Sequence, residues 1–385
     1  MSSGESPTMR PAPPRVLHFV TGGFSGATQV ALDLVRAGMA SGRNQPLLVL
    51  RHKRQTDPAR IEALRAEGLP IEVLPGCSRL LTLFALWSLC RRWRPEVLVA
   101  HGFPEHLLGR WAGLYAGVPH LVHVEHNSRE RYGLWRRAQA LFLARRTDRI
   151  VGCSEGVRQS LLRLGMPAER CIAISNGIRL EPFAEAESHP YAQRQPGLVM
   201  AARFAKQKDH LTLIRALALL AQRGLRPPLL LAGGGSRYHE AAAKRLVKRL
   251  GLGEQVQFLG FHPSVPALLM QHQIAVLSSH YEGMPLSLVE GMAAGCAVLG
   301  TAVPGIQELI QDGVNGRLVP PQDPQAMADA LEALLRAPEE AARLAAAGRR
   351  QALEQHSLAL MQERYEDLLI GLATQHDRPS HRPIS

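Results

Sequence analysis

Two carboxylates, Glu282 and Glu290, bracket a proline-led apolar run in the stretch SSHYEGMPLSLVEGMAAG. The preceding run, IAVLSS, predicts a strand, and Pro285 suits the first turn of the next helix. Glu282 is therefore expected in the loop after the strand and Glu290 inside the helix. Because the first acid lies in a loop, both can converge on one ligand, and a carboxylate that accepts from two adjacent hydroxyls suits a ribose. A solvated acid pair is the alternative, which the apolar neighbours of Glu290 disfavour.

A basic loop precedes these acids in the chain. The segment AARFAKQKDH follows the predicted strand GLVMAA, so Arg203 and Lys208 are expected at the carboxyl end of that strand. A guanidinium offers a planar fork and an ammonium a mobile point charge, which together suit a diphosphate. The free backbone N–H groups at the helix start near Pro285 provide a further seat for an anion. A basic loop alone is usually only solvated, but the nearby acids and helix start favour a phosphorylated ligand.

The first half carries a glycine-containing loop, GGFSGATQ, that joins a strand to a helix. Its Gly23, Ser25 and Gly26 are candidates for a phosphate-binding or acceptor-binding loop, because successive backbone N–H groups can wrap an anion. As a dinucleotide fingerprint the loop fails, since Thr21 takes the place of the first glycine. The next strand ends in Arg51 instead of an acid, which argues against NAD but leaves NADP binding as an alternative.

Two histidines are predicted at strand ends in the same half. His126 follows the strand LVHVE and His101 ends the strand VLVAH, so both can face a ligand. A single histidine at a strand end is more often structural than catalytic. From the residues alone, the structural interpretation is favoured for both.

The elements that position these residues alternate along the chain as short aliphatic runs and helical patterns. Runs that are apolar on both faces predict parallel sheets covered on both sides, and hence an α/β fold of two doubly wound units in series. We place disordered tails at 1–14 and 373–385, a first domain at 15–185 and a second at 186–372. The last helix could pack back on the first domain. Ligands of such sheets bind at the carboxyl ends of the strands, which predicts a cleft between the domains.

Composition sets limits on the partners. The chain has 385 residues, 46% apolar and 20% charged, and a net charge of +12 with a pI near 10.1, which favours an anionic partner. Aromatic residues make up only 5%, and neither zinc-finger spacing nor interleaved basic and aromatic residues occurs, so nucleic acid is disfavoured. The five cysteines are dispersed and form no C-x-x-C pair, which predicts buried thiols in a reducing cytoplasm.

Membrane contact is left open by the sequence. The first residues lack the apolar core of a signal peptide, and the longest apolar run, LLTLFALWSLC, has half of the roughly 20 residues that a membrane span needs. A cytoplasmic protein is expected. The basic, amphipathic segments Arg79 to Arg94 and Arg129 to Arg149 could rest on an anionic membrane face or simply be solvated helices, and the residues do not decide between the two.

The run EGMPLSLVEGMAAG, with RFAKQKD before it and NGI at the close of the first half, resembles glycosyltransferase family four. The resemblance covers about 16–370 and implies a GT-B fold, in which two Rossmann-like domains face each other across a cleft. The N-terminal domain would take the acceptor and the C-terminal domain a nucleotide-sugar donor. Members of the family are retaining transferases, and their E-x7-E motif matches Glu282 and Glu290.

The resemblance also implies roles for individual residues. Glu290 would hold the ribose hydroxyls of the donor, while Glu282 and His126 would orient the donor sugar as the catalytic residues. The full set implied for donor binding is Arg203, Lys208, Gly283, Met284, Pro285, Leu286 and Glu290. The family often has an acid after its paired glycines, where Ser25 and Gly26 intervene here, and this leaves the acceptor contacts open.

The predicted function is transfer of a hexose, with retention, from a UDP-sugar or a GDP-sugar to an acceptor hydroxyl. A lipid-linked or saccharide acceptor in lipopolysaccharide or other cell-envelope polysaccharide synthesis is expected. No D-x-D motif occurs, which agrees with a metal-independent enzyme, and no cofactor besides the donor is expected. The alternatives are an NADP-dependent oxidoreductase and a non-catalytic nucleotide-binding or scaffold protein.

Overall fold

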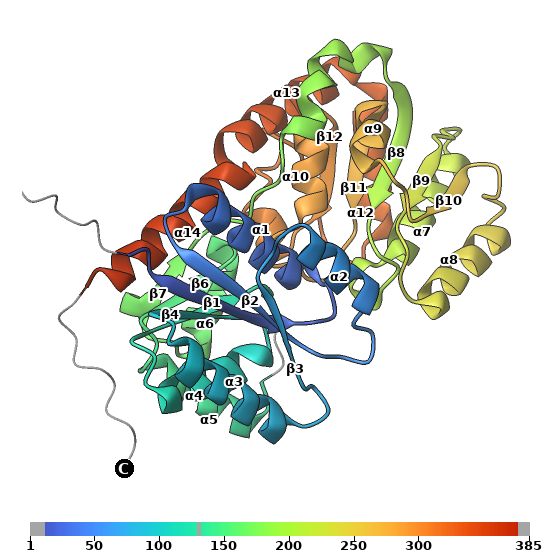
Figure 1. The fold of residues 1–385 in the computed structure, drawn as a ribbon. Coiled ribbons are helices and arrows are strands. Elements are labelled where there is room, and N and C mark those ends of the chain that lie inside the picture. The colour runs from blue at the N-terminus through green and yellow to red at the C-terminus, as the bar shows by residue number, and fades with distance from the viewer. Residues whose placement is uncertain (1–11, 129–131, 376–385) are drawn as a thin grey trace, which may run out of the picture.

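The computed structural model describes residues 12–128 and 132–375, which form two parallel sheets flanked by helices (Figure 1). This confirms the predicted α/β class with two doubly wound units. The tails predicted at 1–14 and 373–385 lie largely outside the described residues, as do residues 129–131 of the second basic segment.

The first sheet has the strand order β3-β2-β1-β4-β5-β6-β7. Val16 of β1 lies opposite Pro46 of β2 and Val97 of β4, and the strand interiors are buried because helices cover both faces. The strands are β1 (Arg15–Thr21), β2 (Gln45–Arg51), β3 (Ile71–Leu74), β4 (Val97–His101), β5 (His120–Glu125), β6 (Arg149–Gly152) and β7 (Cys171–Ala173). The helices are α1 (Gly26–Ser41), α2 (Pro58–Ala66), α3 (Arg79–Trp93), α4 (Glu105–Ala116), α5 (Leu134–Ala144) and α6 (Glu155–Leu164).

The second sheet has the order β10-β9-β8-β11-β12-β13 and follows a connection that contains the 3₁₀ segments η2 (Glu181–Ser188) and η3 (Tyr191–Gln193). Its strands are β8 (Gln195–Ala201), β9 (Leu229–Ala232), β10 (Val256–Gly260), β11 (His272–Leu277), β12 (Ala297–Thr301) and β13 (Arg317–Val319). Its helices are α7 (His210–Gln222), α8 (Arg237–Arg249), α9 (Val265–Met270), α10 (Leu286–Ala293), α11 (Pro304–Gln307), α12 (Pro324–Arg336) and α13 (Pro338–Gln355).

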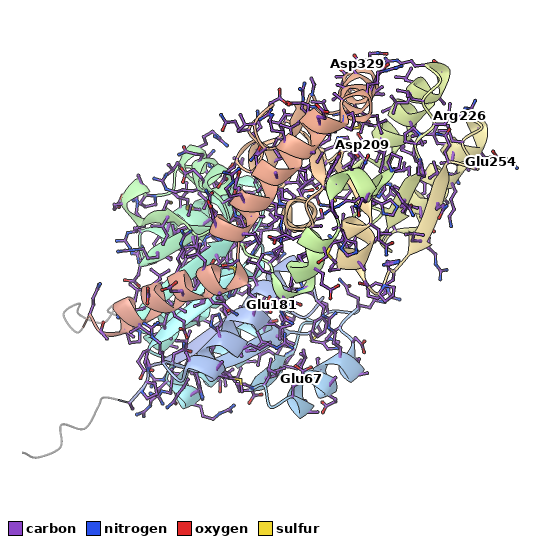
Figure 2. All side chains as sticks on the ribbon, turned by 90° about the horizontal axis from the view of Figure 1, so that it is seen from above. Glu67, Glu181, Asp209, Arg226, Glu254 and Asp329 are labelled. Carbon is purple, nitrogen blue, oxygen red and sulfur yellow. The ribbon has the colours of Figure 1, made fainter. Side chains whose placement is uncertain are left out.

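The last helix, α14 (Leu358–Ala373), returns to the first domain. Tyr365 and Leu369 are buried with Val16 and Val97 in one apolar cluster on the face that α1 also covers. Gln362 Nε2 donates a hydrogen bond to the carbonyl of Asp33 in α1 at 2.9 Å. Figure 2 shows the C-terminal helices running from the second domain along the first. The chain therefore links the two domains twice.

The long apolar run from Leu80 to Cys90 forms most of α3. Leu86 and Leu89 pack in the core of the first domain, whereas Leu80 and Phe84 face solvent. Within the described ranges, no helix combines the length and apolarity required to cross a membrane.

Replacing Leu369 with alanine is expected to destabilise the first domain by about 2–5 kcal/mol, because it removes buried methyl groups between α14 and the sheet. Every tryptophan of the chain (Trp87, Trp93, Trp111 and Trp135) belongs to the first domain, so tryptophan fluorescence during urea unfolding reports on that domain alone. Met39→Ala, on the exposed side of α1 in the same domain, is the matched control and should shift stability by no more than about 0.5 kcal/mol. Equal midpoints for both variants would show that α14 does not stabilise the domain.

Candidate active site

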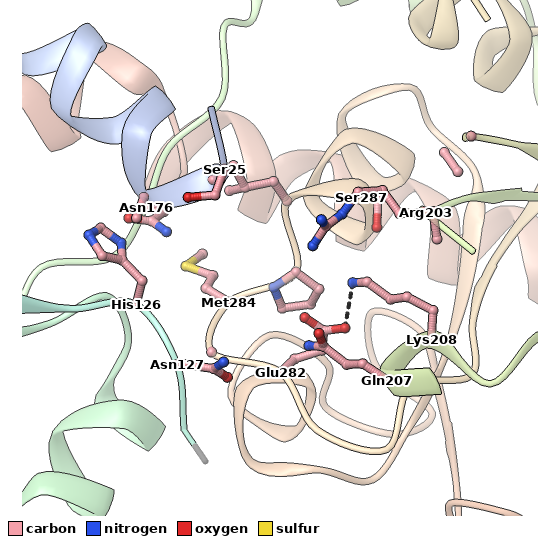
Figure 3. A pocket seen from close by; sticks show the side chains of 18 of the residues that line it. Ser25, His126, Asn127, Asn176, Arg203, Gln207, Lys208, Glu282, Met284 and Ser287 are labelled. Carbon is pink, nitrogen blue, oxygen red and sulfur yellow. Dashed lines mark hydrogen bonds and ion pairs between the residues drawn. The ribbon is translucent and has the colours of Figure 1, made fainter. Parts of the chain in front are cut away.

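A cleft of about 810 Å³ opens between the carboxyl ends of the two sheets. Loops after β1, β4 and β5 of the first domain and after β8, β9 and β11 of the second form its walls. The lining (Figure 3) contains Ser25, Gly26, His126, Arg203, Lys208, Glu282, Gly283, Met284, Pro285, Leu286 and Glu290. Gly23, the one other residue predicted for the site, is not part of the lining. A Cβ on Gly23 would lie 3.3 Å from Gln55 Nε2, and the Gly23 N–H donates to Thr21 Oγ1 at 3.4 Å.

Lys208 and Glu282 form an ion pair in the cleft. Lys208 ends the 3₁₀ turn η4 (Lys206–Lys208) after β8, and Glu282 lies in the loop after β11. The Lys208 Nζ atom lies 2.5 Å from Glu282 Oε1 (Figure 3). The same oxygen accepts a hydrogen bond from Ser279 Oγ at 2.5 Å. Since the Glu282 side chain is almost fully buried, the ammonium and the hydroxyl offset the cost of burying its charge.

Arg203 is exposed in the cleft wall and has no hydrogen-bond or ion-pair partner among the described residues. A turn of three glycines after β9, Gly233–Gly235, packs against the Arg203 loop. A Cβ on Gly233 would lie 2.2 Å from the carbonyl oxygen of Ala202, and Gly233 has a φ of +144°, which favours glycine. A Cβ on Gly234 would meet nothing within 4 Å, so the backbone there is open to the cleft. The sequence analysis did not select this turn, although three glycines directly after an aliphatic strand were a usable signal.

Glu290 lies in α10, and its carboxyl has no partner among the described residues. Burial raises the pKa of Glu290 to about 7, so the group is poised between its neutral and ionised forms at neutral pH. Pro285 is the N-cap of α10 and so lies just before the first turn, in which the sequence predicted it. The backbone N–H groups of Leu286 and Ser287 have no helical acceptors. An acid and a helix N-terminus therefore face the same cleft.

Three histidines form a row from the cleft into the first domain. His126 Nε2 lies 3.3 Å from His101 Nδ1, and His101 Nε2 lies 3.2 Å from His18 Nδ1, with neighbouring rings stacked. Burial lowers the pKa of His126 and His18 to about 3 and that of His101 well below its usual value. All three are therefore neutral, and each contact joins one donor nitrogen to one acceptor nitrogen. The row holds the His126 ring in place. His101 thus has the structural role that the sequence favoured, whereas the sequence analysis did not single out His18.

A second polar cluster extends into the first domain from Glu125, which lines the cleft. Glu125, His106 and His123 bring their ligand atoms within 4.8 Å of one another, close enough for a metal ion. The two imidazole rings are stacked with centroids 3.9 Å apart, however, so their nitrogens do not converge on one ion. The Arg110 guanidinium lies 2.7 Å from His106 Nδ1 and would repel a cation, while Tyr132 Oη lies 2.8 Å from His106 Nε2. This donor set does not fit a metal ion.

The loop that carries Glu282 is held tightly against the first domain. A Cβ on Gly283 would lie 2.3 Å from the carbonyl oxygen of His126, so only glycine fits there without movement of the backbone. Ser154 Oγ donates to the carbonyl of Gly283 at 2.8 Å. Glu308 accepts from the first two backbone N–H groups of α6, each at 2.7 Å, where a carboxylate also complements the helix dipole. Contacts from both domains thus fix the geometry of the cleft.

Arg51, which left NADP binding open in the sequence, is engaged within the first domain. Its buried guanidinium lies 3.2 Å from Glu105 Oε1, and Lys53 Nζ lies 2.6 Å from the same oxygen. Arg51 is not part of the cleft lining. The guanidinium is therefore not available to a 2′-phosphate, and the residue that suggested NADP no longer supports it.

Both halves of the chain match known family models. Residues 25–177 match the model described as "Glycosyl transferase 4-like domain", and residues 184–351 match "Glycosyl transferases group 1". The crystal structure of Anabaena Alr3699/HepE in complex with UDP-glucose superposes with a TM-score of 0.80 and 21% identity, over 93% of this chain and 100% of that chain. The chain belongs to the GT-B glycosyltransferase superfamily.

Curated relatives of this GT-B chain are glycosyltransferases by name. The putative glycosyltransferase EpsD of Bacillus subtilis (strain 168) is 32% identical over 198 residues, 51% of each protein, so the match spans about half the length of that relative. The UDP-Gal:alpha-D-GlcNAc-diphosphoundecaprenol alpha-1,3-galactosyltransferase of Escherichia coli is 25% identical over 65% of this chain and 69% of that protein. The resemblance inferred from sequence is thus confirmed at the level of the superfamily.

The buried histidines of the first domain make stability depend on pH. Five of them have a lowered pKa and are neutral in the fold, namely His18, His101, His106, His123 and His126. Below a pH of about 6.5 the unfolded chain binds protons that the native state does not, so each histidine costs up to about 1.4 kcal/mol of stability per pH unit. Burial raises the pKa values of Glu125 and Glu290 to about 7, so these two acids stabilise the native state as the pH falls from about 7 to about 4.5. They are fewer than the five histidines, so the destabilising effect dominates. Stability is therefore expected to fall as the pH drops from 6.5 to 5.5.

The substitution His123→Phe tests this dependence, because both ring nitrogens of His123 are buried without a hydrogen bond. Between pH 7 and pH 5.5, we expect the free energy of unfolding of the variant to fall by about 1 kcal/mol less than that of the wild type. Urea unfolding followed by tryptophan fluorescence measures this difference. His52→Phe, at an exposed site in the same domain, should behave as the wild type does. A wild-type protein equally stable at both pH values would contradict the prediction.

Proposed function

We propose that the chain is a retaining hexosyltransferase that transfers a hexose from a nucleoside-diphosphate sugar to an acceptor hydroxyl without a metal ion. The proposal rests on charged side chains in the cleft that are available to bind a ligand. Arg203 and Glu290 have no partner among the described residues, and Lys208 can exchange Glu282 for a phosphate. A UDP-sugar is preferred over a GDP-sugar, and the Anabaena neighbour that was solved with UDP-glucose supports this choice.

In this proposal the leaving diphosphate lies between Arg203, Lys208 and the start of α10. Negative charge grows on the diphosphate as the sugar departs, and in this proposal the two cations and the two free backbone N–H groups of the cleft stabilise that charge. The open backbone at Gly234 lets the nucleotide approach closely. The same groups supply the charge that a metal ion would otherwise supply.

Glu290 binds the ribose of the donor. Two adjacent hydroxyls donate to one carboxylate, and these bonds favour its ionised form. A group whose pKa is near 7 in the free protein therefore releases its proton when the nucleotide binds. This coupling links donor affinity to pH.

Glu282 and His126 orient the sugar. The acceptor oxygen attacks the anomeric carbon from the side on which the diphosphate leaves, the bond from that carbon to the diphosphate oxygen breaks, and the acceptor proton passes to the diphosphate. Glu282 is held by Lys208 and Ser279, which suits an orienting carboxylate better than a free nucleophile. His126 is neutral and can donate or accept one hydrogen bond at the sugar.

The acceptor in this proposal is a lipid-linked or saccharide hydroxyl of lipopolysaccharide or another cell-envelope polysaccharide, met at the cytoplasmic face of the membrane. The Escherichia coli relative, whose name specifies a diphosphoundecaprenol acceptor, supports a lipid-linked substrate. Ser25 lies on the side of the cleft opposite Arg203 (Figure 3), and in this proposal Ser25 and its neighbour Gly26, which also lines the cleft, contact the acceptor. Turnover of a UDP-sugar and GDP-sugar panel with a membrane lipid extract would identify the substrates.

Titration calorimetry with UDP, GDP, ADP and NADP tests the donor assignment. We expect UDP to bind best and Lys208→Ala to weaken that binding about tenfold or more, because a cation that contacts the diphosphate is lost. Lys206→Ala removes an exposed lysine two residues away and is the matched control, expected to bind UDP as the wild type does. Binding of NADP alone would overturn the proposal, and unchanged UDP affinity in Lys208→Ala would remove this lysine from the site.

The substitution Glu290→Gln tests the ribose contact through its pH dependence. UDP affinity of the wild type should decline as the pH falls from 8 to 6, because the carboxyl with a pKa of about 7 becomes protonated. The glutamine variant should bind about tenfold more weakly at pH 8 and lose this pH dependence. Glu254→Gln, at an exposed site far from the cleft (Figure 2), should retain the wild-type profile. The same pH profile in the wild type and Glu290→Gln would exclude the ribose contact.

A further inference from the structure

Five large apolar side chains are exposed at the starts of two helices in the first domain. Leu80, Leu81 and Phe84 of α3 are 77%, 52% and 65% exposed, and Leu134 and Trp135 of α5 are 89% and 77% exposed. We call these five residues the apolar rim. We propose that the apolar rim inserts into the surface of an anionic lipid bilayer. The proposal rests on the proposed function, since it places the cleft next to a lipid-linked acceptor.

The position of the apolar rim follows from the topology. In a parallel sheet each helix begins near the carboxyl end of the strand before it, which is the end that faces the cleft. All five residues lie in the first two turns of α3 or α5, and both helices pack against α4 (Figure 1). The rim therefore lies at the cleft end of one helical layer. A side-chain contact also links this region to the cleft. The guanidinium of Arg136, next to Trp135 in α5, lies 5.4 Å from the centroid of the Phe103 ring, and Phe103 lines the cleft.

The charge around the apolar rim selects an anionic surface. Neither α3 nor α5 contains an acidic residue. Arg79 stands at the start of α3, Arg136 and Arg137 lie in the first turn of α5, and Arg79 and Arg137 are exposed. Segments that bind at the membrane interface typically combine exposed leucine, phenylalanine and tryptophan with arginine. The apolar side chains enter the lipid, and the cations bind its phosphates. A solvated helix face would not need so much exposed apolar surface.

The second domain offers a comparison surface. Arg215, Arg245, Lys248 and Arg249 line a cavity between α7 and α8, so this domain also has an exposed basic face. Large exposed apolar side chains are sparse on α7 and α8, where Tyr238 is the main one. This face can attract anionic lipid headgroups but has few apolar side chains that could insert into the bilayer. It therefore serves as the control for membrane binding by electrostatic attraction alone.

Co-sedimentation with vesicles of phosphatidylglycerol and phosphatidylcholine tests the proposal. The full-length chain should bind these vesicles, and Leu80→Ser/Phe84→Ser/Trp135→Ser should reduce the partition coefficient about tenfold or more. Arg245→Gln/Arg249→Gln, the control on the second domain, should keep wild-type binding to within about twofold. Vesicles of phosphatidylcholine alone should bind at least about tenfold more weakly, and raising NaCl from about 0.1 M to about 0.5 M should weaken binding to the anionic vesicles.

Tryptophan fluorescence gives an independent measurement of insertion. Brominated lipids should quench the wild type and leave Trp135→Phe much less quenched, because the other three tryptophans are only partly exposed. Equal vesicle binding by the rim variant and the wild type would overturn the proposal. So would loss of binding in the Arg245/Arg249 control alone, or a wild-type protein that ignores vesicles and instead forms a dimer that the rim variant abolishes. UDP calorimetry on the rim variant separates this result from the proposed function, since donor binding should be unchanged.

Discussion

The close approach of Gly283 to the carbonyl of His126 is the constraint on which the cleft depends. With 2.3 Å between that oxygen and any Cβ, the backbones of the two domains meet at this point with no side chain between them. The Gly283 carbonyl is also held by Ser154, and Glu308 caps the start of α6 from the other domain. Glu282, one residue before Gly283, therefore has partners in both domains. Lys208 and Ser279 of the second domain bind its carboxylate, and Ser128 Oγ of the first domain donates to its backbone carbonyl at 2.6 Å.

Electrostatics around this contact explain why the cleft is suited to a charged ligand. The polar groups behind it are internally satisfied or neutral, as in the histidine row of His18, His101 and His126. In the cleft itself Lys208 and Glu282 neutralise each other, while Arg203 and Glu290 have no partner in the described part of the chain. A phosphate and a diol would complete these interactions, and binding them requires no new buried charge without a partner.

The two domains divide the tasks of the proposed enzyme. The second domain presents rigid strand ends with a glycine turn at Gly233–Gly235, which favours close contact with a nucleotide. The first domain combines a histidine row toward the cleft with an apolar rim toward the outside. The helix α14 packs on the opposite face of the first sheet from α3 and α5, so it leaves that rim uncovered.

The sequence by itself determined the elements and the local placement of most site residues. Strand and helix periods located both sheets, and a strand followed by Pro285 placed Glu282 in a loop and Glu290 in a helix, because these features depend on neighbours along the chain. Only the tertiary structure decided which distant groups pair. Lys208 pairs with Glu282, 74 residues later in the sequence, and Arg51 pairs with Glu105, 54 residues later. The order of the strands in each sheet brings these loops together. Burial, which raises the pKa of Glu290 and neutralises the histidines, likewise arises only when whole layers pack, so no local pattern could predict it.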